Sequence, residues 1–282
     1  MEKGRKFRKV LLWLMLATLT AGLVWAIGAE LAQTNKDVQA AAAVGADDEL
    51  ATIETAGMVK PKDSNIDWAT INRYERQLKQ NTTEYQKLVT QAGNEKAAGA
   101  VSAGTRSAGT ASAQKFNQIS EELAAVYEKG NCITKAKTVR AAGQSRLKNA
   151  EMAFNDLDSG LINDYSDQRT AMSEAGLAGL KEDKANGSPA DIAKLKATML
   201  PRLEKMSSET TKLLGEVTKL LDQVRQAAGG GVGGLGGCAK QVVTSGAADG
   251  PAGLLRPLTS LMNMLKNMGS NLASTMQAVA SL

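Results

Sequence analysis

The chain has no histidine among its 282 residues, and this absence narrows the chemistry that it can perform. Without histidine there is no Ser–His–Asp or Cys–His nucleophilic site, no common type of zinc site and no ready proton shuttle at pH 7. Enzymes that use paired carboxylates need no histidine, so the absence alone does not exclude catalysis. We expect a non-enzymatic protein with no catalytic residues, no cofactor and no metal site.

Aromatic residues and proline are also scarce, with three Phe, three Trp, four Tyr and five Pro. Alanine, leucine, lysine, glutamate and glutamine are plentiful, and these residues favour helices. Alanine and leucine fill only thin layers between helices, which favours long and narrow bundles over a thick globular core. The composition therefore predicts an all-α fold, an elongated antiparallel bundle of coiled-coil-like helices.

An excess of positive charge is confined to the N-terminus. The net charge is +5, and the first ten residues alone hold five basic side chains against Glu2: Lys3, Arg5, Lys6, Arg8 and Lys9. The rest of the chain is nearly balanced, has no basic run and offers few aromatic side chains for stacking on bases. We therefore expect no nucleic-acid partner, and no small-molecule substrate is indicated.

An apolar stretch without any charged residue, residues 10–29, follows the basic residues at once. Basic flanks stay on the cytoplasmic side of a membrane, so this pattern predicts export of the remaining chain. Residues 1–29 are either a signal peptide, cleaved after Ala26 or Ala29, or an uncleaved membrane anchor. Cleavage is the preferred reading, although the length also suits a spanning helix. The expected location is the periplasm or cell surface, with an inner-membrane anchor as the alternative.

The two cysteines, Cys132 and Cys238, are expected to form a disulfide if the chain is exported. Closing so long a loop would stabilise the fold by about 4–5 kcal/mol in the chain-entropy model. The alternative is a pair of buried, unpaired thiols.

Residues 30–228 read as a helical bundle. Its best-defined helix spans residues 189–227, with Ser188 as N-cap and Pro189 in the first turn. Its apolar positions alternate in steps of three and four, interrupted only by Thr210. Such a seam predicts packing along the whole helix, although Pro201 should kink or divide it.

Earlier helices are predicted over residues 34–57, from Ile66 with Ser64 or Asn65 as N-cap, from 114 to about 129, and from 133 to about 183 with a bend at Gly160. The helix from Ile66 has a heptad seam with one polar interruption, Asn81. Residues 93–113, rich in Ala, Gly and Ser, are expected to be a flexible link. The alternative is a close helix contact through small residues.

Residues 229–250 contain a glycine-rich run that predicts a hinge. Residues 231–236 match the GxGxxG pattern, but they follow a long helix where a dinucleotide site needs a strand. No cofactor is therefore expected there.

The C-terminal segment, residues 251–282, predicts a Met/Leu-rich amphipathic helix. Its apolar face has three alternative roles: it completes the bundle, binds a partner or enters a membrane. The candidate partner-binding residues are Leu258, Leu261, Leu265, Met268, Leu272 and Met276.

These features favour a structural or assembly component of a bacterial cell-envelope machine. The layout of an exported helical bundle resembles the minor pilus subunits of type IV secretion and conjugation systems, a resemblance of architecture without a diagnostic motif. It implies other envelope proteins, or further copies of the chain, as partners through helical faces, and a membrane contact through the N-terminal segment. The alternative is a membrane-anchored helical binding module, such as a sensor or adhesin domain.

Overall fold

The computed structural model describes the backbone of residues 2–62, 65–228 and 251–282, and the side chains of residues 28–62, 65–226, 228 and 253–282. The described residues form helices and no strand, which confirms the all-α prediction. The helices are α1 (Glu2–Met58), α2 (Trp68–Ala98), α3 (Ala103–Lys129), α4 (Ile133–Phe154), α5 (Ser159–Asn186), α6 (Pro189–Ala228) and α8 (Pro251–Ser281).

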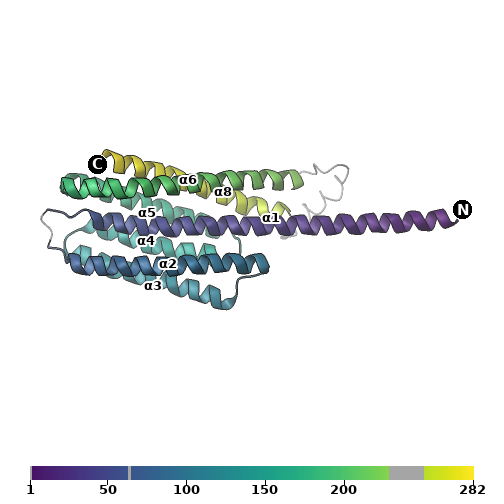
Figure 1. Cartoon of the computed structure of the whole chain (residues 1–282), viewed down its shortest axis with the longest axis horizontal. Coiled ribbons are helices and arrows are strands. Elements are labelled where there is room, and N and C mark those ends of the chain that lie inside the picture. The colour runs from purple at the N-terminus through teal and green to yellow at the C-terminus, as the bar shows by residue number, and fades with distance from the viewer. Residues whose placement is uncertain (1, 63–64, 229–250) are drawn as a thin grey trace.

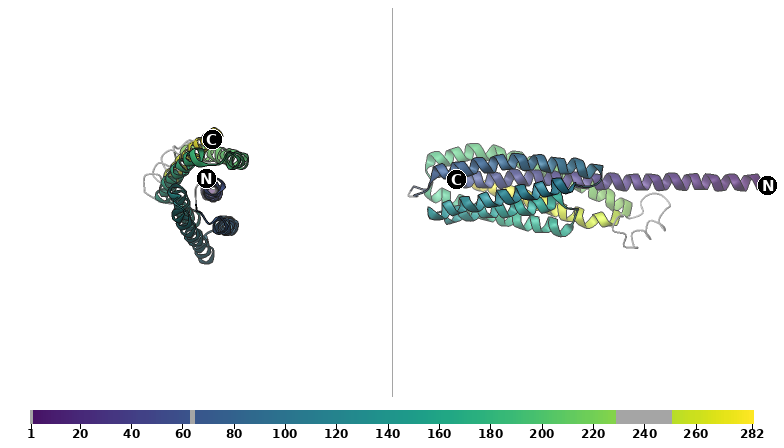
Figure 2. Two further views of the ribbon diagram at one scale, coloured as in Figure 1. Left: turned by 90° about the vertical axis from the view of Figure 1, so that its left-hand side faces the viewer. Right: turned by 90° about the horizontal axis from the view of Figure 1, so that it is seen from below.

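The helices lie side by side along one direction (Figure 1). Seen end-on, α6, α8, α5, α4 and α3 form a curved row, and α1 and α2 lie on its concave side (Figure 2). Helices α1 to α4 enclose one apolar core, and α1 and α4 also belong to the second bundle, with α5, α6 and α8. Two bundles therefore share α1 and α4.

Helix α1 is far longer than the helix predicted over residues 34–57. It runs without a break from Glu2 to Met58, and its N-terminal part extends beyond the other helices (Figure 1). Residues 30–44 contain no glycine or proline and are rich in alanine, so nothing in the sequence ends the helix there. The expected boundary at residue 29 is therefore no boundary of secondary structure.

The prediction of a flexible link over residues 93–113 is wrong, and the alternative of close packing through small residues is what the structure shows. Helix α2 continues to Ala98, and α3 begins at Ala103. The short turn between them is held by Glu95, which accepts hydrogen bonds from the Ser102 backbone N–H at 2.7 Å and from Thr105 Oγ1 at 2.6 Å. These bonds, with another from Gln91, lower the pKa of Glu95 to about 2.

Small side chains then let α3 approach its neighbour. Buried positions recur at helical spacing along its first half, at Thr105, Gly109, Ala113 and Phe116. A Cβ added at Gly109 would overlap the ring of Phe154 in α4. The sequence of small residues therefore makes a close helix contact.

The single helix predicted over residues 133–183 is divided into α4 and α5. The break lies at residues 155–158, just before the bend expected at Gly160. Asp158 is the N-cap of α5 and its Oδ1 accepts the Gly160 N–H at 2.8 Å. Asp, Asn and Ser side chains compete for backbone hydrogen bonds in this way, which explains a helix end at this sequence.

The helix start predicted for α2 is corrected by two residues. Asp67 is its N-cap and accepts the Thr70 N–H at 3.0 Å, in place of Ser64 or Asn65. The heptad seam is confirmed: Ile71, Leu78, Tyr85 and Ala92 are buried. Asn81 is buried as well, and its Nδ2 donates to the Ser112 carbonyl and hydroxyl of α3, both at 3.1 Å.

Helix α6 matches its prediction closely. The Ser188 Oγ accepts the Asp191 N–H at 3.1 Å, and the apolar seam faces the core from Leu195 to Val224. Pro201 lies inside the helix and does not divide it. The hydroxyl of buried Thr210 donates to the Met206 carbonyl at 2.8 Å, so the one polar seam position is satisfied within the helix.

Helix α8 completes the second bundle, packed against α5 and α6. The six residues predicted to bind a partner lie in this interface: Leu258, Leu261, Leu265, Met268 and Leu272 are buried, and Met276 is half-buried. The partner-binding assignment is corrected accordingly, because within the described residues this apolar face packs mainly into a core. The glycine-rich hinge predicted over residues 229–250 lies outside the described residues.

Candidate functional site: an ionic collar around α1

Where α1 passes through the bundle, its side chains are small, so side chains of other helices reach its backbone. Residues 38–46 are mostly alanine. Carbonyl groups of α1 accept side-chain hydrogen bonds from α4, α5 and α6: Ala42 from Asn149 at 2.9 Å, Gly45 from Arg169 at 3.3 Å, Ala46 from Arg146 at 2.9 Å, Asp47 from Arg202 at 3.1 Å and Ala56 from Lys135 at 2.7 Å.

Three ion pairs accompany these bonds, and we call them the ionic collar. Glu49 pairs with Arg146 of α4, Asp48 with Arg169 of α5, and Glu54 with Arg202 of α6. Three helices that follow one another in the chain, α4, α5 and α6, thus each contribute one arginine to a carboxylate of α1. The Glu49–Arg146 pair has no solvent exposure, the Asp48–Arg169 pair is nearly as buried, and the Glu54–Arg202 pair is partly exposed.

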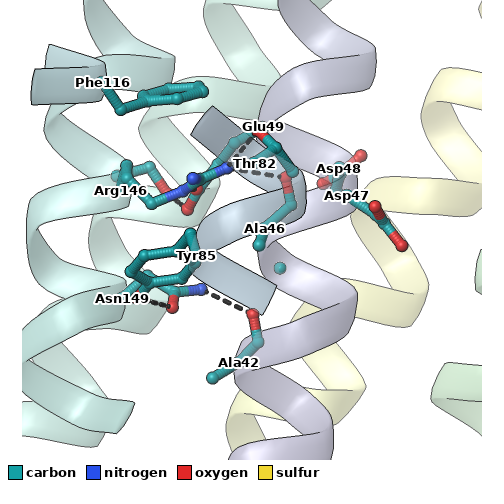
Figure 3. A network of polar contacts seen from close by, with 12 residues as sticks. Ala42, Ala46, Asp47, Asp48, Glu49, Thr82, Tyr85, Phe116, Arg146 and Asn149 are labelled. Atoms are coloured by element: carbon teal, nitrogen blue, oxygen red, sulfur yellow. Dashed lines mark hydrogen bonds and ion pairs between the residues drawn. The ribbon is translucent and has the colours of Figure 1, made fainter. Parts of the chain in front are cut away.

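Arg146 is the largest fully buried side chain among the described residues. Its guanidinium lies between two aromatic rings, with Cζ 3.9 Å from the Phe116 ring centre and 4.6 Å from that of Tyr85 (Figure 3). Such cation–π contacts strengthen when water is excluded. Its Nη2 also donates to Thr82 Oγ1 at 3.2 Å, and the partner carboxylate of Glu49 accepts a further bond from Ser145 Oγ at 2.8 Å.

Asn149 lies one helical turn further along α4 and joins four helices. Its Oδ1 accepts the Tyr85 hydroxyl of α2 at 2.7 Å, and its Nδ2 donates to the Ala42 carbonyl of α1 and to the Tyr165 hydroxyl of α5 at 2.8 Å (Figure 3). A Cβ added at Gly45 would overlap that hydroxyl, so glycine is required for this approach. Burial raises the pKa of both tyrosines, so both hydroxyls stay neutral, with Tyr85 as a donor and Tyr165 as an acceptor toward Asn149.

The collar fixes the position of α1 more than it adds stability. Removing two charges from water costs several kcal/mol per ion, and a buried pair with good geometry roughly repays that cost. A helix of alanines packs almost equally well after a shift or rotation, whereas three acid–arginine pairs are satisfied in one register only. The arrangement therefore specifies where α1 sits along the bundle.

A third buried cation, Lys135, lies just beyond the collar, near the C-terminal end of α1. Lys135 Nζ is 2.7 Å from Asp183 Oδ1, and both side chains are only 4% exposed. This pair borders a cavity of about 40 Å³ between α1, α4, α5, α6 and α8. Hydroxyl and amide groups of Thr52, Thr138 and Asn271 line it, so it has room and partners for a few water molecules.

Two further carboxyl groups, buried Asp37 and half-buried Glu75, form no ion pair among the described residues. Asp37 Oδ2 and Glu75 Oε1 have no hydrogen-bond partner among the described residues. Burial raises the pKa of Asp37 to about 6, and the Glu216 carboxylate of α6 adds to this effect. Burial raises the pKa of Glu75 to about 7, with a further increase from Glu54. Both groups change charge near neutral pH.

The predicted disulfide involves Cys238, which lies outside the described residues. Cys132 is half-buried, and its Sγ lies 3.6 Å from the Gly130 carbonyl oxygen. It borders a surface cleft of about 300 Å³ at the end of the bundle where α5 meets α6. The cleft wall combines both charge signs, with Lys62, Lys135, Glu182 and Asp183.

The described part of the chain contains no grouping of three or more Cys, Asp or Glu side chains that could hold a metal ion. None of the helices, within that part, is long and apolar enough to cross a membrane. The side chains of residues 10–27, which make up most of the apolar stretch predicted to target a membrane, lie outside it. Its targeting role stays a prediction.

Sequence reasoning missed the collar. The signal available was the run Asp47–Asp48–Glu49 in an otherwise apolar, alanine-rich segment, because three acids in succession must face three sides of a helix. Arg146 and Arg169 lie at core-facing positions of α4 and α5, but long cations also occupy helix edges, so their burial could not be read from spacing alone.

Comparison with known protein families, with curated proteins and with solved structures returns no match.

Proposed function

We propose that this chain is an exported, non-enzymatic structural component of a bacterial cell-envelope assembly, of the kind associated with type IV secretion or conjugation pili. The N-terminal part of α1 holds it to the membrane, and the bundle stands outside. One observation carries the proposal: the helix that contains the predicted membrane segment is the same helix that the ionic collar fixes in the bundle.

Continuity of α1 favours the anchor over the cleaved signal. Proteases bind their substrates as extended strands, whereas residues 24–30 lie within an unbroken helix. An unbroken helix also links the position of the bundle to that of the membrane segment. Because the bundle holds α1 in one register, it has a defined height and rotation relative to the bilayer. A bundle attached rigidly to its membrane helix is more typical of a structural protein than of a freely diffusing enzyme.

The proposal is tested first on the full chain produced in a bacterial host. Mass spectrometry of the mature protein should find the N-terminus intact, and alkaline extraction should leave it with the membranes. A mature chain that begins at residue 27 or 30 and is found in the soluble periplasmic fraction would contradict the anchor.

The assembly role requires a second experiment. The chain is crosslinked in intact cells, extracted in mild detergent and sized together with its crosslinked partners. We expect a complex of fixed composition that contains envelope proteins or further copies of the chain. A chain that stays monomeric at its native abundance would contradict the structural role.

A second candidate function, an anchored binding module, is favoured by the cleft beside Cys132. The cleft lies at the end of the bundle opposite the N-terminal part of α1, where a soluble ligand has free access. Substitution of Glu182 and Lys62 at its wall, with no change in the crosslinked complex but a loss of ligand capture, would favour this function over the structural one.

A further inference from the structure

The alignment of α6 with α1 places the end of α6 near the predicted membrane surface. Arg202 pairs with Glu54, and Glu216 faces Asp37, so the two helices run antiparallel. From Glu216, α6 continues twelve residues to Ala228, about 18 Å. The same step along α1 leads from Asp37 to residue 25, inside the apolar stretch of residues 10–29.

Helix α2 stops short of that level. Gln39 of α1 packs against Gly93 of α2, and α2 ends five residues later at Ala98, about 8 Å further on. Its end is therefore level with residue 34 of α1. Figure 1 shows the same difference, with α6 reaching further than α2 toward the N-terminal part of α1.

The level that the end of α6 reaches can be compared with the thickness of the headgroup layer of a bilayer. The headgroup layer adds about 5–7 Å to each side of the hydrocarbon core, which equals four or five residues of a helix. If residues 10–29 span the core, this layer covers α1 up to about residue 34. By the alignment above, residues 219–223 of α6 are level with residues 34–30 of α1 and lie at headgroup depth. Residues 224–228 are level with the last residues of the apolar stretch, at the edge of the hydrocarbon core.

The described charges at the end of α6 and the beginning of α8 are mostly positive. We define the α6–α8 tip as residues 219–228 and 253–258. It carries three exposed cations, Lys219, Arg225 and Arg256, and one acid, Asp222, which lies 3.6 Å from Arg225. The α4–α5 turn at the same end carries the exposed acids Asp156 and Asp158 instead.

We propose that the α6–α8 tip binds the anionic headgroups of membrane lipids beside the point where α1 enters the bilayer. The inference rests on the proposed membrane anchor. Anionic lipids attract cations within a Debye length of the surface, and arginine binds phosphate through paired hydrogen bonds. The acids of the α4–α5 turn lie near Lys96, which donates to the Asn155 carbonyl, so this turn offers lipid headgroups no comparable excess of cations. The membrane contact therefore has two points, one through α1 and one through this tip.

The test uses the full chain in lipid nanodiscs of two compositions, phosphatidylcholine alone and phosphatidylcholine with a third of phosphatidylglycerol. Hydrogen–deuterium exchange is measured for peptides covering residues 219–228 and 253–258. We expect slower exchange in the anionic discs only. The variant K219E/R225E/R256E should lose this protection, by about fivefold for each cation replaced.

A matched control, K194E/K205E/K212E, also reverses three cations, but at positions of α6 that lie further from the membrane. It should keep the lipid-dependent protection of the tip. Equal exchange of the tip in both disc types, with the chain still held in the discs, would overturn the tip contact and leave the anchor intact. Failure of the chain to enter either disc would overturn the anchor, and the tip contact with it.

Discussion

Arg146 of α4 donates a hydrogen bond from Nε to Oε2 of Glu49 in α1, and neither side chain has any solvent exposure. The two residues are 97 positions apart in the chain, so their pairing forms only when the tertiary structure does. A fully buried pair of this kind is sensitive to the loss of one partner, because the other then keeps an uncompensated charge. The first prediction follows from this asymmetry.

Glu49→Ala should lower the free energy of unfolding by about 3–5 kcal/mol, because buried Arg146 keeps its charge without a partner. Urea denaturation of the purified chain in detergent gives the value. The double variant with Glu49→Leu and Arg146→Leu should be less destabilised than the sum of its single variants. Glu209→Ala, at an exposed position 3.8 Å from Lys205, is the control and should change stability by less than about 0.5 kcal/mol.

Two glycines should respond to alanine in opposite directions. At Gly109 the new Cβ overlaps the Phe154 ring, so Gly109→Ala should destabilise by about 1–3 kcal/mol. At Gly176 the nearest atom, Thr52 Cγ2, lies 3.8 Å from the new Cβ, and alanine is the better helix former. Gly176→Ala should stabilise by up to about 1 kcal/mol. The unfolding temperatures of the two variants give the comparison. An equal change in both variants would argue against the close α3–α4 contact.

The pH dependence of stability should reflect Asp37 and Glu75. Their pKa values of about 6 and about 7 in the fold exceed the ordinary values of 3.8 and 4.5, so the folded chain binds more protons between these limits. The free energy of unfolding should therefore fall as the pH rises from about 4 to about 7. Lys36 and Gln33 near Asp37, and Lys135 near Glu75, reduce the effect without reversing it.

Asp37→Asn and Glu75→Gln should remove this dependence. Each variant should be more stable than the parent by about 1–2 kcal/mol at pH 8 and equal to it near pH 4. Denaturation at a series of pH values measures the difference. A gain in stability that is the same at every pH would mean that these carboxyls are not protonated in the fold.

The two cysteines should not pair within one chain. Cys132 borders the same cleft as Gly187, just before α6 begins, and α6 then runs about 58 Å to its other end. Only ten residues join Ala228 to Cys238, and a chain of that length spans at most about 36 Å. Mass spectrometry of unreduced peptides should find no intrachain Cys132–Cys238 link, and finding one would contradict the packing of α6.

Regular apolar spacing made much of the fold predictable. The seam of α6 and the heptads of α2 depend on local periodicity, and both helices follow the pattern. The continuity of α1 and the full break before α5 were not predicted. In both segments a weak preference to continue the helix competes with a weak preference to end it, and periodicity does not show which one prevails. The short α2–α3 turn depends on Glu95 bonding to Ser102 and Thr105, a contact across seven to ten residues that no periodicity records.

The candidate site was less predictable than the fold. Periodicity identifies apolar faces, whereas the collar consists of charged residues that lie inside, against the usual preference. The small residues Gly45 and Ala46 leave room for arginines to reach the backbone of α1 at residues 45–47. These contacts depend on three other helices packing against α1 together. The role of α8 was among the alternatives, and only packing against α5 and α6 decides between them.

The central place of α1 also constrains the order in which the chain can fold. Helix α1 leaves the ribosome first, yet the arginine that pairs with Glu54 is separated from it by 148 positions. During synthesis, the carboxylates of α1 must therefore remain hydrated until most of the chain has emerged. Contacts between such distant segments slow folding and prolong the exposure of apolar seams. Completion of the bundle thus waits for α6, and a truncated or stalled chain leaves α1 without the partners that fix its register.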